Sequence, residues 1–242
     1  MQTMEAHRDK FIGLVKACDE TGCLECIAKY DDFYNAIAAN YSGINMLQLA
    51  CLYRLEHVAL TLIDRKCDMR HRDNYGSTAL MYAICYGLTN VVADIINKSD
   101  VATRITLSGS SEMIYLSAYK DEKNIIKMIN RGYYIYYKND RNESLFTEAI
   151  VYKLKEVMQK LIDIDTCFAE EFNILYRNMA YMKDEFYHNI IKYCVDKRAS
   201  YKYTIIATMN DATPTNALYQ SFHTTYAVQL VDIICDFILL PI

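Results

Sequence analysis

A period of about 33 residues runs through most of this chain of 242 residues, and it limits the possible folds more than any other feature. It is clearest over residues 73–98, where a turn signal, the N-cap candidate Thr78, an apolar helix, Gly87 and a second apolar helix follow one another. Each such helix pair buries only one face and therefore needs neighbours. The period predicts an all-α solenoid of helix-turn-helix pairs with atypical terminal caps.

The apolar positions of this unit recur along the chain. One period earlier they are Leu47, Ala50, Val58 and Ile63, and two periods later they are Phe146, Ala149, Val157, Leu161 and Ile162. The repeat between them fits with a slip of one residue, through Ile114, Ser117, Ile125, Ile126 and Ile129. A more degenerate repeat covers residues 179–195. The linkers repeat too, at Lys66–Met69, Gly132–Ile135 and Arg198–Tyr201.

The unit over residues 73–96 resembles the ankyrin repeat, whose pattern has a glycine turn, Thr-Pro-Leu-His, a small residue, a glycine and paired valines. The matching residues are Asp73, Gly76, Thr78, Leu80, Ala83, Gly87, Val91 and Val92. Ala79 and Met81 replace the proline and the histidine. Turn glycines are lost in other repeats, as at Arg54, Asp121, Lys153 and Phe186. The resemblance covers roughly residues 10–200, and the divergence is similar to that of ankyrin proteins from large DNA viruses or intracellular bacteria.

We expect a single ankyrin-repeat-like solenoid over residues 1–242. Its parts would be an N-terminal capping repeat at 1–32, about five repeats at 33–202 and a helical C-terminal cap at 203–242. The end of the chain, FILLPI, is more apolar than a solvent-facing cap should be. We expect it to fold inward or to dock on a partner or a second copy, which predicts a monomer or a weak dimer through the C-terminal helix.

The composition argues against several classes of partner. The net charge of −4 does not favour broad binding to a phosphate backbone, so no nucleic acid is expected. Binding of nucleic acid through Arg70, Arg72 and Lys138 is an alternative that predicts strong salt dependence. The N-terminus lacks a signal-peptide core and residues 228–242 are too short to span a bilayer, so no membrane is expected. Nine scattered cysteines fit a reducing compartment, which predicts cytoplasmic localisation, in a host if the origin is viral.

Three cysteines near the N-terminus, Cys18, Cys23 and Cys26, match the start of an iron–sulfur spacing. The 33-residue register instead places Gly22 at the hinge of the first helix pair. It puts Cys18 and Cys26 in the core and Cys23 in the turn near solvent, and free cysteine packs as a small hydrophobe. We therefore expect no metal and no cofactor. A cysteine-based metal or redox protein remains the alternative of another class.

Catalytic motifs do not emerge from the sequence. The stretch at 107–111 resembles neither a phosphate loop nor a nucleophile elbow. Carboxylate pairs such as Glu170 and Glu171 are adjacent, so their side chains diverge. We therefore predict that the protein is not an enzyme.

Tyrosines repeat at the same period and form the candidate binding site. The sequence places Tyr53, Tyr86, Tyr119 and Tyr152 33 residues apart, just before the turn of each helix pair, with Tyr119 shifted by one position under the slip. Tyr41, Arg72 and Tyr75 lie at or near hairpin tips in the same register. The resemblance implies that both regions line a concave face. Codon bias with half-buried packing is the competing interpretation of the 22 tyrosines.

Together these features predict a non-catalytic protein-protein interaction module that binds a partner through its concave face. The partner is a host protein if the origin is viral. An adaptor that recruits a ubiquitin-ligase or signalling complex through its C-terminal segment is the alternative. Related viral proteins carry an F-box-like tail with Leu-Pro near its start, whereas here Leu240, Pro241 and Ile242 end the sequence, so we expect no such domain to follow.

Overall fold

The computed structural model describes residues 3–178, 184–222 and 228–238. It divides into two compact units, Met1–Tyr152 and Lys153–Ile242. Helices dominate both units, as the period predicts, and the named strands form one short hairpin. Among the described helices, none has the length and apolar character needed to cross a membrane.

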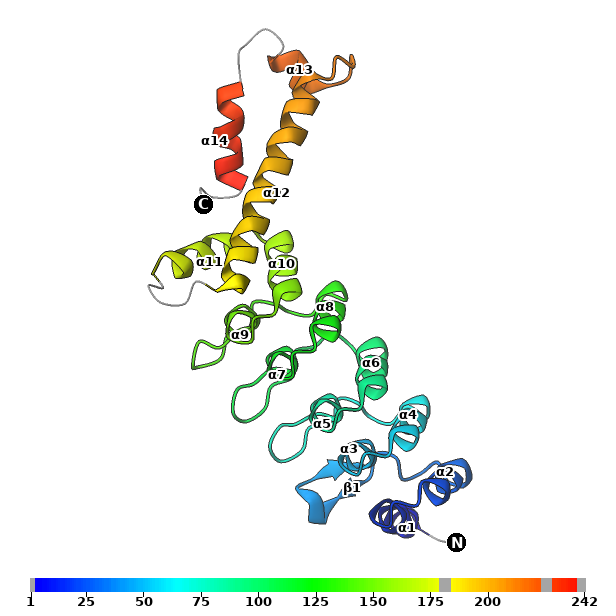
Figure 1. The fold of residues 1–242 in the computed structure, drawn as a ribbon. Coiled ribbons are helices and arrows are strands. Elements are labelled where there is room, and N and C mark those ends of the chain that lie inside the picture. Colours follow the sequence, from blue (N-terminus) through cyan, green and yellow to red (C-terminus); the bar gives the residue numbers. More distant parts are fainter. Residues whose placement is uncertain (1–2, 179–183, 223–227, 239–242) are drawn as a thin grey trace. The chain divides into compact units, whose positions relative to one another are not determined.

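The first unit is a stack of helix pairs. They are α1 (Met4–Lys16) with α2 (Glu20–Lys29), α3 (Met46–Leu52) with α4 (Glu56–Asp64), α5 (Ala79–Cys85) with α6 (Thr89–Lys98), and α7 (Glu112–Ala118) with α8 (Glu122–Asn130), followed by α9 (Leu145–Val151). Within this unit, α1, α3, α5, α7 and α9 form one row, here called the inner row, and α2, α4, α6 and α8 form an outer row (Figure 1). Each helix packs on its own partner and on the next helix of its row.

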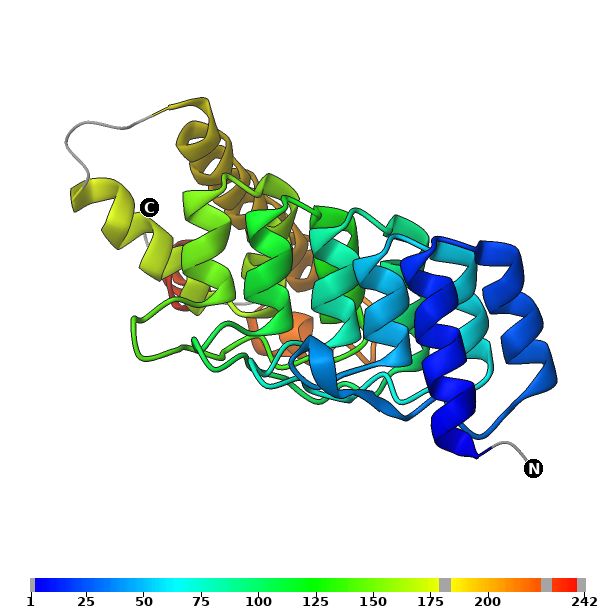
Figure 2. The same ribbon diagram turned by 90° about the horizontal axis from the view of Figure 1, so that it is seen from below.

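Long loops connect each outer helix to the next inner helix. The first contains β1 (Ile37–Ala38), the 3₁₀ turn η1 (Ala39–Tyr41) and β2 (Ile44–Asn45), with antiparallel strands. Isolated antiparallel bridges, Ile105 with Ser111 and Lys138 with Ser144, occur in the later loops. In the first unit, these loops gather at one end of the helices and the short turns within each pair lie at the other end (Figure 2).

Inner helices begin at equivalent residues. Their N-caps are Asn45, Thr78, Ser111 and Ser144, each 33 residues from the next. Each cap side chain accepts a hydrogen bond from the backbone N–H three residues later, which satisfies an otherwise unpaired donor at the helix start. The spacing stays at 33 through α7, so the predicted slip of one residue in that repeat is wrong.

The turns within the helix pairs also recur at this interval. Arg54, Gly87, Lys120 and Lys153 adopt left-handed backbone conformations, with φ of 59°, 73°, 57° and 58°. The sequence correctly places lost turn glycines at Arg54 and Lys153. In the third repeat the turn glycine is replaced at Lys120 and not at Asp121, because Asp121 is the N-cap of α8. Phe186 lies within a helix and is not a turn residue. Lysine and arginine cost about 1–3 kcal/mol in this conformation, which the packed helices on either side of Arg54 and Lys120 must offset.

The core of the first unit follows the apolar period. At the inner-helix crossing, Ala50, Ala83, Leu116 and Ala149 are all fully buried. The third repeat departs from the pattern here, because Leu116 replaces alanine and the buried polar residue Asn124 replaces the outer-helix valine. These two changes made the sequence of this repeat look shifted.

The first helix pair corrects the predicted cysteine register. Its hinge is Cys18, which is exposed with φ of 53°, whereas Gly22 lies inside α2. Cys23 is fully buried rather than near solvent, and Cys26 is buried as predicted. Glycine at position 22 allows close packing, because an added Cβ would lie 2.4 Å from Asp19 Oδ2.

The second unit contains α10 (Lys155–Ile164), α11 (Cys167–Asn178), α12 (Glu185–Asn210), α13 (Ala217–Phe222) and α14 (Val228–Ile238). α12 contacts the other four helices. It runs through residues 198–201, so the linker predicted there is wrong. The equivalent linkers begin at Lys66 and Gly132, whose φ values are 62° and 88°, whereas α12 contains neither glycine nor proline to interrupt it.

The C-terminal helix α14 packs on α12, where Val231 and Cys235 are fully or almost fully buried. Lys202 of α12 also contacts Asp232 of α14 at 2.6 Å. The predictions for Leu240, Pro241 and Ile242 concern residues outside the described part of the chain. Met179 and Met182 of the degenerate repeat also lie outside it. A single solenoid over 1–242, with its caps at 1–32 and 203–242, stays a prediction.

Candidate interaction surface

Four tyrosines occupy one equivalent position in the first unit. Tyr53, Tyr86, Tyr119 and Tyr152 are the C-cap residues of α3, α5, α7 and α9. Tyr119 is in line with the others, so the shift predicted for it is wrong. Its side chain is 48% exposed and the other three are partly exposed. We call these four residues the tyrosine row; it follows the short-turn end of the inner helices.

The start of the row is joined to the first hairpin. The hydroxyls of Tyr41 and Tyr53 lie 3.1 Å apart, and their rings meet edge to face. This hydrogen bond lowers the pKa of Tyr41 and raises that of Tyr53, because it stabilises the ionised form of Tyr41 and the neutral form of Tyr53. Lys16 Nζ lies 5.2 Å from the centre of the Tyr41 ring. The predicted residues Tyr41 and Tyr53 therefore do come together.

Further along the row, each tyrosine has a different neighbour. The Arg54 guanidinium lies 5.6 Å from the Tyr86 ring centre, a cation–π distance. The Tyr119 ring lies 5.6 Å from that of Tyr115. A hydrogen bond with Cys85 and partial burial raise the pKa of Tyr119, so its hydroxyl stays protonated and able to donate at neutral pH.

The other predicted tip residues lie at the opposite end of the inner helices. Tyr75 is 62% exposed, and its carbonyl accepts a hydrogen bond from the Leu107 N–H of the next loop. The Arg72 guanidinium donates to the carbonyl of Ile105. An inner helix of seven residues separates this end from the tyrosine row by about 10 Å. The tips and the row therefore form two regions joined by the inner helices.

Two tyrosines between these regions were not identified from the sequence. Tyr82 and Tyr115 are partly exposed on α5 and α7. The Tyr82 hydroxyl donates to Asp73 Oδ2 at 2.8 Å, which ties the helix to its loop, and burial raises the pKa of Tyr82. Their own separation of 33 residues was the signal that could have identified them. Glu148 takes the same position on α9.

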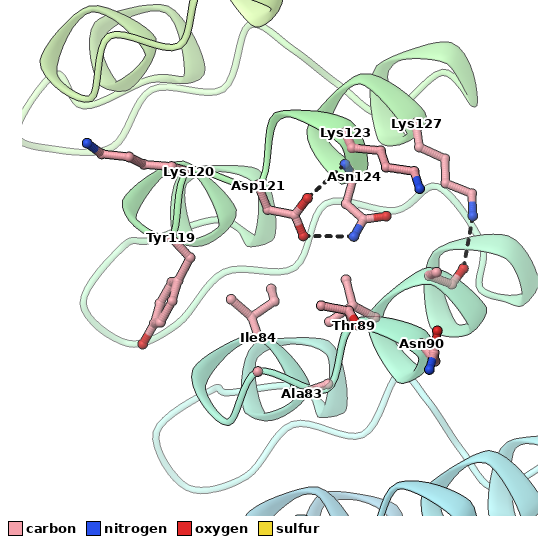
Figure 3. Close-up of a pocket in the computed structure, with 13 residues that line it drawn as sticks. Ala83, Ile84, Thr89, Asn90, Tyr119, Lys120, Asp121, Lys123, Asn124 and Lys127 are labelled. Carbon is pink, nitrogen blue, oxygen red and sulfur yellow. Dashed lines mark hydrogen bonds between the residues drawn. The ribbon is translucent and has the colours of Figure 1, made fainter.

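A pocket of about 610 Å³ opens beside the row, between the α5–α6 and α7–α8 pairs (Figure 3). Its apolar lining consists of Ala83, Ile84 and Val92, which are buried at its base, and of Ala93, which is partly exposed. Its other wall comes from the end of α7 and the start of α8. The polar residues on that wall are Lys120, Asp121, Lys123, Asn124 and Lys127, with Tyr119 at the edge. The pocket therefore combines an apolar lining with several cationic groups.

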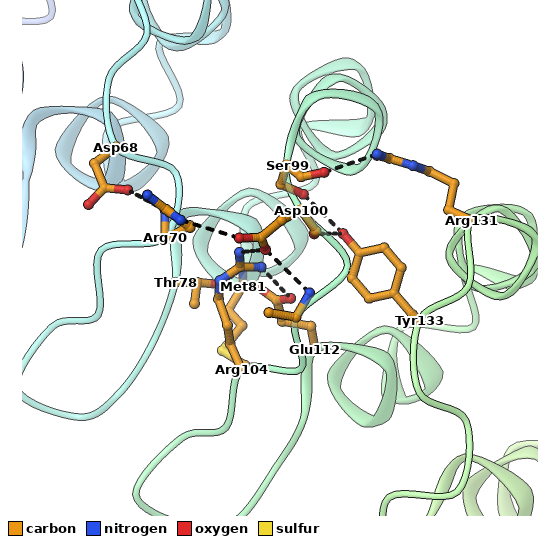
Figure 4. A network of polar contacts seen from close by, with 11 residues as sticks. Asp68, Arg70, Thr78, Met81, Ser99, Asp100, Arg104, Glu112, Arg131 and Tyr133 are labelled. Carbon is orange, nitrogen blue, oxygen red and sulfur yellow. Dashed lines mark hydrogen bonds and ion pairs between the residues drawn. The ribbon is translucent and has the colours of Figure 1, made fainter.

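A polar network fixes the loop between α6 and α7 (Figure 4). Glu112, only 3% exposed, accepts hydrogen bonds from the Thr78 hydroxyl at 2.7 Å and from Arg104 at 3.4 Å. Arg104 also pairs with Asp100. The Tyr133 hydroxyl donates to the Asp100 carbonyl at 2.9 Å. The network thereby links three successive repeats and holds the loop that carries the tip residue Leu107.

The residues considered for other chemistry have ordinary surroundings. Burial raises the pKa of Cys23 to about 12 and also raises that of Cys26, which lowers the reactivity of both thiols. Over the described residues, no group of three His, Cys, Asp or Glu side chains could hold a metal ion. Of the residues considered for nucleic-acid binding, Arg70 pairs with Asp68 and Asp100, and Arg72 donates to the Ile105 carbonyl. Lys138 is exposed.

Comparison with known proteins identifies a family over part of the first unit. No curated protein matched the sequence. Residues 14–105 match the family model described as ankyrin repeats (3 copies), and this segment includes α2 to α6. Ankyrin repeats are generally protein–protein interaction modules, and the family is typically non-catalytic. With its stacked helix pairs and this match, the chain contains ankyrin repeats over residues 14–105.

Proposed function

We propose that this protein binds a partner protein through the surface formed by the tyrosine row and the exposed side of the inner helices. The observation that carries the proposal is the recurrence of tyrosine at the C-cap of four successive inner helices, with every ring at least partly exposed. A need to fill the core alone would select apolar residues at this position. The general role of ankyrin repeats in protein interaction supports the same conclusion.

The chemistry of the row suits protein recognition. A tyrosine ring offers a large, rigid contact area, and its hydroxyl supplies a hydrogen bond at the edge. Contacts within the chain limit the movement of these rings, through Tyr41 at Tyr53, Arg54 at Tyr86 and Tyr115 at Tyr119. A surface that is ordered before binding loses less side-chain entropy when the partner arrives. The row therefore acts as a prepared set of anchors.

Replacement of Tyr53, Tyr86 and Tyr152 by alanine tests the proposal. Interface anchors of this kind cost about 1–3 kcal/mol each when truncated, so the triple variant should lose most of its capture of the partner. Proteins retained from a cell lysate would be identified by mass spectrometry, and the affinity of the best-enriched one would be measured with purified components. Tyr119 is left intact because it also lines the pocket.

Tyr203→Ala is the matched control, because this tyrosine is 75% exposed on α12 and lies outside the row. The control should retain the partner. Circular dichroism would establish that the triple variant is folded. Equal affinity of the folded triple variant and the wild type for the purified partner would refute the role of the row.

A further inference from the structure

We propose that the pocket beside Tyr119 binds an aliphatic side chain, flanked by carboxylates, from an extended segment of the partner protein. This inference rests on the proposed function and adds the chemical class of the partner. It starts from the pocket lining, where Ala83 and Ile84 of α5 lie opposite the polar and charged groups at the rim formed by α7 and α8 (Figure 3). Val92 and Ala93 of α6 also line the pocket. Such a lining favours an apolar group that enters the pocket and polar groups that remain at its rim.

The charges at the rim determine which polar groups fit. The lining contains three lysines and one carboxylate, that of Asp121. Asp121 is occupied within the wall, since it accepts hydrogen bonds from the backbone N–H and the side-chain amide of Asn124, at 3.2 and 2.7 Å. Lys127 is occupied as well, because its ammonium donates to the Ala93 carbonyl at 3.2 Å.

Two lysines remain available for a partner. Lys120 and Lys123 are both exposed, and within the described part of the chain neither forms a salt bridge. Their positions on a chain of net charge −4 make this rim locally cationic. Complementary charge speeds association and disfavours wrong partners, so carboxylates are the expected neighbours of the apolar anchor.

The position of the pocket indicates a peptide segment as the source of these groups. Tyr119 belongs to both the row and the pocket, and Tyr86 immediately precedes Gly87 of the opposite wall. A segment that crosses the row would therefore pass the pocket mouth. Its volume of about 610 Å³ exceeds the needs of a single ion and falls within the range of about 300–1,000 Å³ typical of ligand sites.

Selection from a random library of 12-residue peptides displayed on phage tests the inference. The full chain would be used as wild type, as the double variant Lys120→Glu/Lys123→Glu, and as the control Lys29→Glu/Lys138→Glu. The control makes the same change in charge at exposed sites outside the pocket. Wild type and control should enrich peptides with two or more acidic residues beside Leu, Ile, Val or Met, and the double variant should not.

The most enriched peptide would then be measured by fluorescence polarisation. We expect the double variant to bind this peptide at least tenfold more weakly than wild type. Thr89→Trp, which narrows the pocket, should also weaken binding of the peptide. Changing the aliphatic residue of the peptide to serine should have a similar effect. The inference is overturned if no peptide is enriched, if basic or uncharged sequences dominate, or if the folded double variant binds equally well. Equal displacement by single-stranded DNA would also overturn it, since that would indicate a general anion site.

The two proposals can fail separately. If the double variant keeps full affinity while the alanine variant of Tyr53, Tyr86 and Tyr152 loses the partner, only the pocket inference fails. If the pocket selects acidic, aliphatic peptides but the alanine variant retains its partner, the row fails as the interaction surface.

Discussion

At the scale of single residues, the end of each inner helix combines a folding role with an exposed surface. The C-cap tyrosine is followed by a residue in the left-handed conformation, which reverses the chain into the outer helix. Glycine meets this requirement at position 87, and Arg54 and Lys120 meet it in neighbouring repeats with a long cationic side chain. Arginine and lysine in place of the turn glycine therefore put positive charge directly beside the tyrosine row.

A glycine in the first helix pair gives a prediction at the same scale. Gly22→Ala should lower the free energy of unfolding by about 1 kcal/mol, because the new methyl group displaces the Asp19 carboxylate from its capping bond to the Gly22 N–H. It would also lie 2.8 Å from Leu14 Cδ2. Urea unfolding followed by circular dichroism measures the change.

Gly13→Ala is the matched control for this substitution. Gly13 lies inside α1 with no atom within 4 Å of an added Cβ, so alanine should raise the free energy of unfolding by about 0.5–1 kcal/mol through its better helix propensity. If both substitutions stabilise the protein equally, Gly22 has no special packing role.

The same region illustrates a limit of prediction at the residue scale. A glycine in the sequence suggested the hinge, yet the left-handed residue is Cys18 and Gly22 is helical. The sequence pattern alone could not distinguish a glycine needed for its φ from one needed for the space beside Asp19. The positions of Cys18 and Cys23 were misassigned for this reason, whereas Cys26 faces the core as predicted.

At the scale of elements, the period predicted the helices wherever each repeat retains its own caps and turns. The N-caps Asn45, Thr78, Ser111 and Ser144 begin the inner helices at a constant interval. Prediction failed where a stop signal was missing, as in α12, which continues through Arg198. Positions in the tyrosine row followed from the same interval. The pocket could not be foreseen, because it depends on how two adjacent helix pairs pack.

The loop between α6 and α7 gives a prediction about pH. Burial raises the pKa of Glu112. The folded protein therefore holds this proton to higher pH than the unfolded chain, whose glutamates titrate near about pH 4.3. Glu112 thus favours folding at low pH and loses this contribution as the pH rises through its raised pKa. We expect the stability of Glu112→Gln relative to wild type to increase between pH 4 and pH 7, as measured by urea unfolding.

Glu25→Gln, the same change at an exposed site of α2, measures the effect of losing one negative charge by itself. Glutamine at position 112 keeps one acceptor oxygen for the Thr78 hydroxyl, and its amide NH2 takes the place of the oxygen that Arg104 contacts. Its effect on these bonds does not change with pH, so the pH dependence of the difference from wild type reports the buried charge. Identical pH profiles for the two variants would contradict the assignment to Glu112.

At the scale of the whole molecule, stability in the first unit should depend on position in the stack. Among the described helices, α5 packs on α3, α6 and α7, whereas α1 packs mainly on α2 and α3 at one end of the stack. In repeat proteins the stability is close to a sum over repeats and their nearest-neighbour interfaces, so a helix with neighbours on both sides opens less often than a terminal one.

Amide hydrogen exchange of the full chain, followed by mass spectrometry, tests this dependence. Peptides that cover α5 should exchange more slowly than those that cover α1, although α1 is the longer helix and would be the more stable of the two in isolation. Comparable protection of both helices would mean that the unit opens as one cooperative body and not by loss of its terminal pair. Slow exchange at α5 would also indicate that the walls of the pocket beside Tyr119 are formed before a partner arrives, since α5 provides Ala83 and Ile84 of its lining.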